Sequence, residues 1–95
     1  MENLVEALER GDTLAEVQGI TQEIGDAIAR LAEAELESGR VETARAILEG
    51  LVVTNHRDPA AWALLSSAHR ELGNFLAARF CAEVAAKLAP EDPRV

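Results

Sequence analysis

The fold is decided by two consecutive stretches of 34 residues, GDAIARLAEAELESGRVETARAILEGLVVTNHRD (25–58) and PAAWALLSSAHRELGNFLAARFCAEVAAKLAPED (59–92). Placed one above the other without a gap, they agree at about ten positions. The identical pairs include Ala27/Ala61, Leu31/Leu65, Ala34/Ala68, Gly39/Gly73, Ala44/Ala78, Arg45/Arg79 and Glu49/Glu83. Exchanges such as Ile28/Trp62 and Val41/Phe75 keep further positions hydrophobic. A fixed period of this length indicates that each stretch is one supersecondary unit.

Within each unit the apolar spacing is helical. One stripe contains Ile28, Leu31, Ala32 and Glu35, and its counterpart contains Trp62, Leu65, Ser66 and His69. Gly39 and Gly73 follow these first helices, where a left-handed residue is needed to turn the chain back. Each unit is therefore predicted to be a helical hairpin.

Capping residues mark the helix ends. Asp58 is expected to cap a helix that has Pro59 at its first position, and Asn74 is expected to cap a helix over 75–88 that Pro90 stops. Ahead of the repeats, Thr13 with Glu16 fits a capping box, and Thr21 is a candidate cap for the first repeat helix. Small residues at Ala44 and Ala78 are expected to let the two helices of a hairpin approach closely.

Charge limits the classes of partner. The net charge of -8 argues against nucleic acid, which requires clustered Lys and Arg. The imbalance lies in residues 1–49, where 12 acids face 4 arginines, whereas residues 50–95 hold five of each sign. This acidity either keeps a small surface solvated or steers a basic partner.

The sequence offers no constellation for catalysis. Cys81 is the single cysteine and is predicted to be a buried thiol, and neither His56 nor His69 has acidic or thiol neighbours at metal spacing. No phosphate loop, dinucleotide loop or HExxH motif occurs, so neither an enzyme nor a metal or cofactor is expected. Without an apolar run of membrane length or a signal peptide, the chain is expected to be a soluble cytoplasmic protein.

The repeat resembles the tetratricopeptide signature, with Trp62, Leu65, Ala78, Ala85 and Pro90 at matching places. The resemblance implies an all-α fold of two tetratricopeptide hairpins (25–58 and 59–92) in a right-handed α-solenoid fragment. Short N-terminal helices over 1–24 would precede it, and 93–95 would be a tail. Such repeats bind extended peptides along a concave groove lined by the first helices. By repeat position, the groove residues are Ala29, Glu33, Leu36, Glu37, Ala63, Ser67, Arg70 and Glu71.

A narrower resemblance involves the segments GDTLA (11–15), GIT (19–21) and ESGRVE (37–42). Together with Leu31 and Ala32 they look like the class II chaperones of bacterial type III secretion, which hold hydrophobic translocators. The chain is also similar to the small tetratricopeptide chaperones of needle subunits. Class II chaperones usually carry three repeats, so a chain that stops at Val95 is expected to be an N-terminal fragment or to close its end on another chain.

Two modes of protein binding follow. In the first, the groove holds an aggregation-prone segment of a secreted client or an apparatus subunit, with Leu36 and the alanines burying apolar anchors. In the second, the chain is a structural adaptor that pairs with itself through Leu4, Val5 and Leu8 or through the end beyond Pro90. A homodimer is expected in either case.

Overall fold

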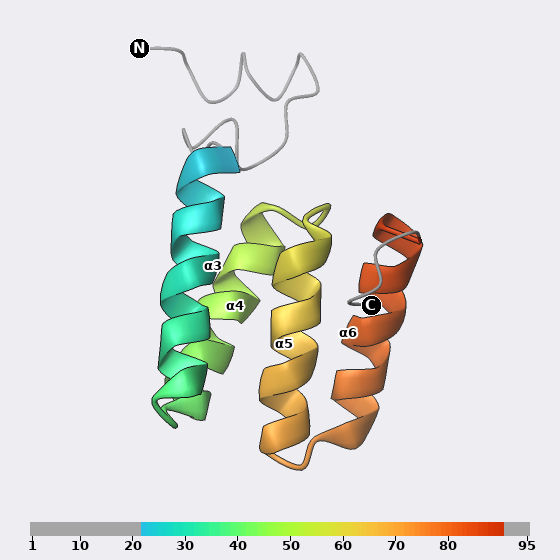
Figure 1. Cartoon of the computed structure of the whole chain (residues 1–95). Helices are drawn as coiled ribbons and strands as arrows, with labels where there is room; N and C mark the ends of the chain where they lie inside the picture. The colour runs from blue at the N-terminus through green and yellow to red at the C-terminus, as the bar shows by residue number, and fades with distance from the viewer. Residues whose placement is uncertain (1–21, 91–95) are drawn as a thin grey trace.

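The computed structural model describes residues 22–90, which form four α-helices and no strand. The helices are α3 (Gln22–Glu37), α4 (Val41–Thr54), α5 (Pro59–Glu71) and α6 (Phe75–Leu88). They follow one another as two antiparallel hairpins, and α4 lies between α3 and α5 in contact with both (Figure 1). The predicted all-α hairpin fold is confirmed, although α3 begins three residues before the predicted repeat boundary at Gly25.

The 34-residue period is visible in the backbone. Helices α4 and α6 each have 14 residues and start 34 positions apart. Their N-cap residues share one conformation, with φ -86° and ψ 64° at Arg40 and φ -87° and ψ 70° at Asn74. The glycine of each turn has positive φ, 88° at Gly39 and 82° at Gly73, as predicted for a left-handed C-terminal residue. Equivalent residues therefore build equivalent hairpins.

Most of the completely buried side chains in the described residues are alanines. Ala32, Ala44, Ala61, Ala68 and Ala85 are completely buried, and Leu48 is the one large side chain in the described residues that is equally enclosed. Ala44 and Ala78, the two positions predicted to need a small residue, are 0% and 5% exposed. These methyl groups thus let the helices approach closely around a few larger side chains such as Leu48 and Leu65.

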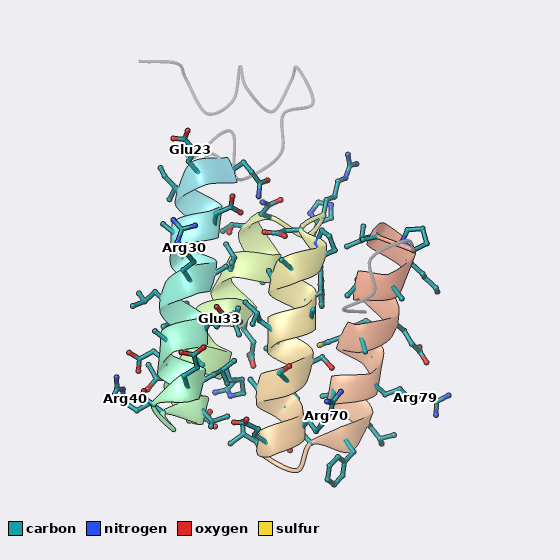
Figure 2. The ribbon with its side chains drawn as sticks, viewed as in Figure 1. Glu23, Arg30, Glu33, Arg40, Arg70 and Arg79 are labelled. Atoms are coloured by element: carbon teal, nitrogen blue, oxygen red, sulfur yellow. The ribbon has the colours of Figure 1, made fainter. Side chains whose placement is uncertain are left out.

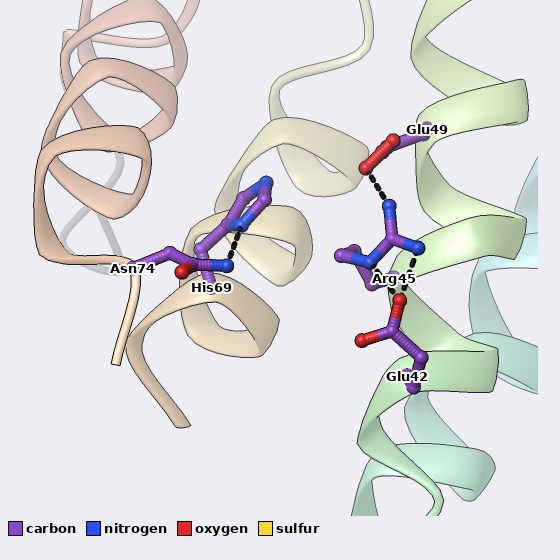
Figure 3. Close-up of polar contacts among 5 residues, drawn as sticks. All are labelled: Glu42, Arg45, Glu49, His69 and Asn74. Carbon is purple, nitrogen blue, oxygen red and sulfur yellow. Dashed lines mark hydrogen bonds and ion pairs between the residues drawn. The ribbon is translucent and has the colours of Figure 1, made fainter. Parts of the chain in front are cut away.

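The predicted caps have different outcomes. Asp58 caps α5 as expected, because its carboxylate accepts a hydrogen bond of 3.0 Å from the amide of Ala60. Asn74 occupies the N-cap position of α6 but its side chain does not cap the helix. Its Nδ2 atom lies 3.3 Å from Nδ1 of His69 instead (Figure 3). The predicted cap at Asn74 was therefore wrong, since the preceding helix offers its side chain another partner.

Leu31 departs from the predicted apolar stripe. Its stripe partners Ile28, Ala32 and Glu35 are half-buried or buried, whereas Leu31 is 56% exposed. The equivalent Leu65 is 3% exposed, because it belongs to the buried cluster to which α3, α4 and α6 also contribute. No described helix precedes α3, so the corresponding side of α3 is open within residues 22–90.

The N-terminal predictions lie outside the described residues. They are the caps at Thr13 and Thr21 and the self-association residues Leu4, Val5 and Leu8.

Candidate protein-binding site

The predicted groove residues lie on two helices that contact each other. Ala29, Glu33, Leu36 and Glu37 belong to α3, and the other four belong to α5. The two helices pack directly against one another in addition to their contacts with α4. We call the exposed and half-buried members of this set the α3/α5 face: Glu33, Leu36, Glu37, Ala63, Ser67, Arg70 and Glu71.

Ala29 has a different environment from the rest of the predicted set. It is 8% exposed and belongs to the hydrophobic core cluster that also contains Ala32 and Ala61. Its methyl group therefore stabilises the packing of the two helices and adds little surface for a partner. Leu36 is half-buried and packs against the same cluster, so part of its side chain remains available.

Helix α5 contributes the small side chains and the basic side chain of this face. Ala63 and Ser67 are half-buried, and the Ser67 hydroxyl donates a hydrogen bond of 3.3 Å to the carbonyl of Ala63. Arg70 and Glu71 are exposed near the end of the helix. Figure 2 shows Glu33 on α3 and Arg70 on α5, whereas Arg79 projects from α6 away from both.

Charged groups on the α3/α5 face have no partner among the described residues. Within residues 22–90, the side chains of Glu33, Glu37 and Arg70 make neither a hydrogen bond nor an ion pair. Glu33 and Glu37 are four positions apart on one helix, where like charges cost a few tenths of a kcal/mol. These carboxylates are free to receive basic groups from another molecule.

By contrast, several acidic side chains near the first hairpin turn and on the second helices form ion pairs with arginines. Arg45 bridges Glu42 and Glu49 on α4, and these two contacts raise the pKa of its guanidinium (Figure 3). Arg79 pairs with Glu83 on α6 at 3.1 Å. These contacts satisfy each charge within its own helix, which distinguishes them from Glu33 and Glu37.

One exposed apolar patch was missed by the sequence analysis. On α6, Phe75, Leu76 and Phe80 are 69%, 86% and 60% exposed. The ring of Phe80 meets Trp62 edge to face with centroids 6.2 Å apart, and the rest of it faces outward. The sequence does indicate this patch, because the apolar Leu76 stands where the first repeat has the charged Glu42.

Two searches of the described residues were negative. Residues 22–90 contain no group of three or more His, Cys, Asp or Glu side chains placed to hold a metal ion. Within the same range, no helix has both the length and the apolar character that a membrane span requires.

Comparison with known families identifies the repeat. The model of the tetratricopeptide repeat family matches residues 12–68, more than half of the chain. The chain belongs to the tetratricopeptide repeat family. No curated protein matches its sequence. Tetratricopeptide repeats are protein–protein interaction modules, so the partner of this tetratricopeptide protein is another polypeptide. Helix α6 lies beyond the matched range, but it repeats the length and cap conformations of α4 and completes the second helical hairpin.

Proposed function

We propose that this tetratricopeptide protein is a cytoplasmic chaperone of the class II type III secretion kind, which holds an extended segment of a secreted client on the α3/α5 face. The observation that carries the proposal is the pair of unpartnered carboxylates, Glu33 and Glu37, beside the half-buried Leu36. The resemblance of segments 11–15, 19–21 and 37–42 to that chaperone class supports the choice of client.

The proposed mechanism follows from these side chains. Apolar anchors of the client pack on Leu36 and Ala63, which are partly exposed and need no rearrangement to receive them. Basic residues of the client pair with Glu33 and Glu37, and this charge complementarity fixes register and speeds association. A client held in this way cannot use the same segment to aggregate.

The test reverses the charge of the face without touching the core. Glu33→Lys with Glu37→Lys changes two exposed side chains, so the fold should be preserved. Co-expression with the products of adjacent genes, followed by affinity purification, measures how much client is retained. We expect the double variant to lose about 1.4 kcal/mol or more of binding free energy, which is roughly a tenfold loss of affinity.

A matched control makes the same change of net charge elsewhere. Glu42→Lys with Glu83→Lys alters exposed positions of α4 and α6 and should leave client binding intact. The proposal fails if both double variants bind the client equally well. Loss of binding in the control alone would place the client on the second helices.

A second candidate function is self-association through α6. It is favoured by Phe75, Leu76 and Phe80, which form an exposed apolar patch on one helix. Light scattering during gel filtration should then give the mass of a homodimer for the native chain and of a monomer for Leu76→Glu. A native chain that stays monomeric at tens of micromolar would exclude this candidate.

A further inference from the structure

The two helices of the α3/α5 face differ in charge. Helices α3 and α5 run in the same direction and pack directly against each other, so residues 34 positions apart lie at the same level on the two helices (Figure 1). Glu33 is thus level with Ser67, and Leu36 is level with Arg70. At these two levels α3 presents an acidic and an apolar side chain, whereas α5 presents a neutral and a basic one.

Arg70 is the basic side chain of this face. It is exposed, and within residues 22–90 it makes neither a hydrogen bond nor an ion pair. The acidic Glu71 follows it directly, but successive residues point about 100° apart around a helix. Glu71 is also level with Glu37, so this last level is acidic on both helices and does not distinguish them. The guanidinium of Arg70 can therefore receive a carboxylate from another molecule.

The separation of the helices limits the spacing of a segment that crosses them. Packed helices have axes about 8–10 Å apart. In an extended chain, side chains on the same side are two residues apart, which is about 7 Å. A client side chain on Leu36 therefore brings its neighbour two positions away, toward α5, within reach of the long side chain of Arg70. The neighbour two positions away on the other side stays over α3, where Glu33 offers a carboxylate.

We propose that the α3/α5 face selects an extended client segment in which an apolar residue has a basic residue two positions away on one side and an acidic residue two positions away on the other. The basic residue pairs with Glu33, the apolar residue packs on Leu36, and the acidic residue pairs with Arg70. This inference rests on the proposed function, which places the client on this face, and it makes Arg70 the residue that determines specificity. A face that acted only through its excess of acids would prefer basic residues on both sides.

Two synthetic peptides that differ in one residue separate these alternatives. Their cores are Lys-Ser-Leu-Ser-Glu and Lys-Ser-Leu-Ser-Lys, each made in both chain directions with uncharged flanks and blocked ends. Titration of the isotope-labelled full chain, followed by NMR, measures Kd and identifies the backbone amides that shift. We expect the native chain to bind the Lys/Glu peptide roughly fivefold more tightly than the Lys/Lys peptide, with shifts at Arg70 and Leu36.

Substitution of Arg70 should change the preference and not only the affinity. Arg70→Glu should reverse it in favour of the Lys/Lys peptide, and Arg70→Gln should abolish it. The matched control is Arg79→Glu, which makes the same change of net charge at an exposed arginine of α6 that projects away from the face (Figure 2). It should keep the native preference. Because both arginines are exposed, circular dichroism should show an unchanged fold for every variant.

Three results would overturn the inference. They are a native preference for the Lys/Lys peptide, an Arg70→Glu variant that keeps the native preference, or the absence of shifts on α3 and α5 with either peptide. If client retention still falls in the Glu33→Lys, Glu37→Lys variant, the proposed function stands and only the role of Arg70 is lost. Unchanged client retention in that double variant would instead contradict the proposed function itself.

Discussion

The hydroxyl of Ser66 on α5 donates a hydrogen bond of 2.7 Å to the backbone carbonyl of Ala78 on α6. Both residues are buried, so the bond crosses the interior of the second hairpin. A carbonyl oxygen has two lone pairs, and Ala78 can accept this bond in addition to one within its own helix. The first hairpin has the completely buried Ala32 at the position of Ser66 and makes the same approach without a hydroxyl.

Ser66→Ala should therefore be tolerated sterically and cost only the hydrogen bond. We expect it to lower the free energy of unfolding by about 1 kcal/mol in urea titrations. Ser66→Val should cost more, about 1–3 kcal/mol, because added methyl groups force the two helices apart. A Ser66→Ala midpoint equal to that of the native chain would show that the bond contributes nothing.

Alanine substitution should have opposite effects at two glycines. Neither Gly50 nor Gly73 has an atom within 4 Å of an added Cβ, so backbone conformation decides the sign. Gly73 has φ 82°, and Gly73→Ala should destabilise the chain by about 1 kcal/mol. Gly50 lies within α4, where Gly50→Ala should stabilise by about 0.5–1 kcal/mol. Denaturant titrations of the two variants check the predicted signs, and shifts in the same direction would contradict the argument.

Glu35 and Arg40 form an ion pair across the Gly39 turn. The hydrogen bond from Arg40 holds the pKa of the Glu35 carboxyl below its usual value of 4.5, with a smaller effect of the Arg40 charge. A lowered folded-state pKa stabilises the fold above pH 4.5, and this contribution is lost as the pH falls through the folded pKa.

Arg40→Ala should thus raise the pKa of Glu35 toward 4.5 in a carboxyl NMR titration. Among residues 22–90 Arg79 pairs with Glu83 alone, so Arg79→Ala should leave the pKa of Glu35 unchanged. An unchanged pKa in the Arg40 variant would mean that the pair does not form in solution.

Cys81 should give the chain an alkaline dependence of stability. Burial, and to a smaller degree the charge of Glu49, raise the pKa of its thiol above 9.0. Because the folded-state pKa is the higher one, the contribution is present below pH 9 and is lost as the pH rises through the folded pKa. The native Tm should begin to fall near pH 9 and should continue to fall as the pH rises through the higher folded-state pKa. Cys81→Ala should show a smaller decrease, and parallel curves for the two proteins would contradict this assignment.

Local features of the fold were predictable from the sequence. The positive φ of Gly39 and Gly73 and the cap at Asp58 depend on residues within one turn, so a 34-residue period and a few capping residues identify them. Helix α6 runs from Phe75 to Leu88 as predicted, because an uninterrupted helical pattern ends just before Pro90, although the predicted side-chain cap at Asn74 does not form.

Features that depend on a neighbouring helix were not predictable in the same way. Leu31 and Leu65 are identical in sequence and in repeat position, yet Leu65 lies in a buried cluster with residues of the neighbouring helices and Leu31 is 56% exposed. Ala29 was placed in the groove by repeat position, yet the contact between α3 and α5 buries it. The exposure of Glu33 and Glu37 agrees with their predicted positions, whereas their role in binding stays a prediction.

Trp62 stands where the two hairpins meet. Its indole Nε1 donates a hydrogen bond of 2.8 Å to the carbonyl of His56 in the segment between α4 and α5, and its ring meets Phe80 of α6. The chain contains one tryptophan and no tyrosine, so its ultraviolet emission originates from this junction alone. Fluorescence of the unlabelled protein is thereby a local reporter, sensitive to separation of the hairpins and to detachment of α6 before the rest of the chain unfolds.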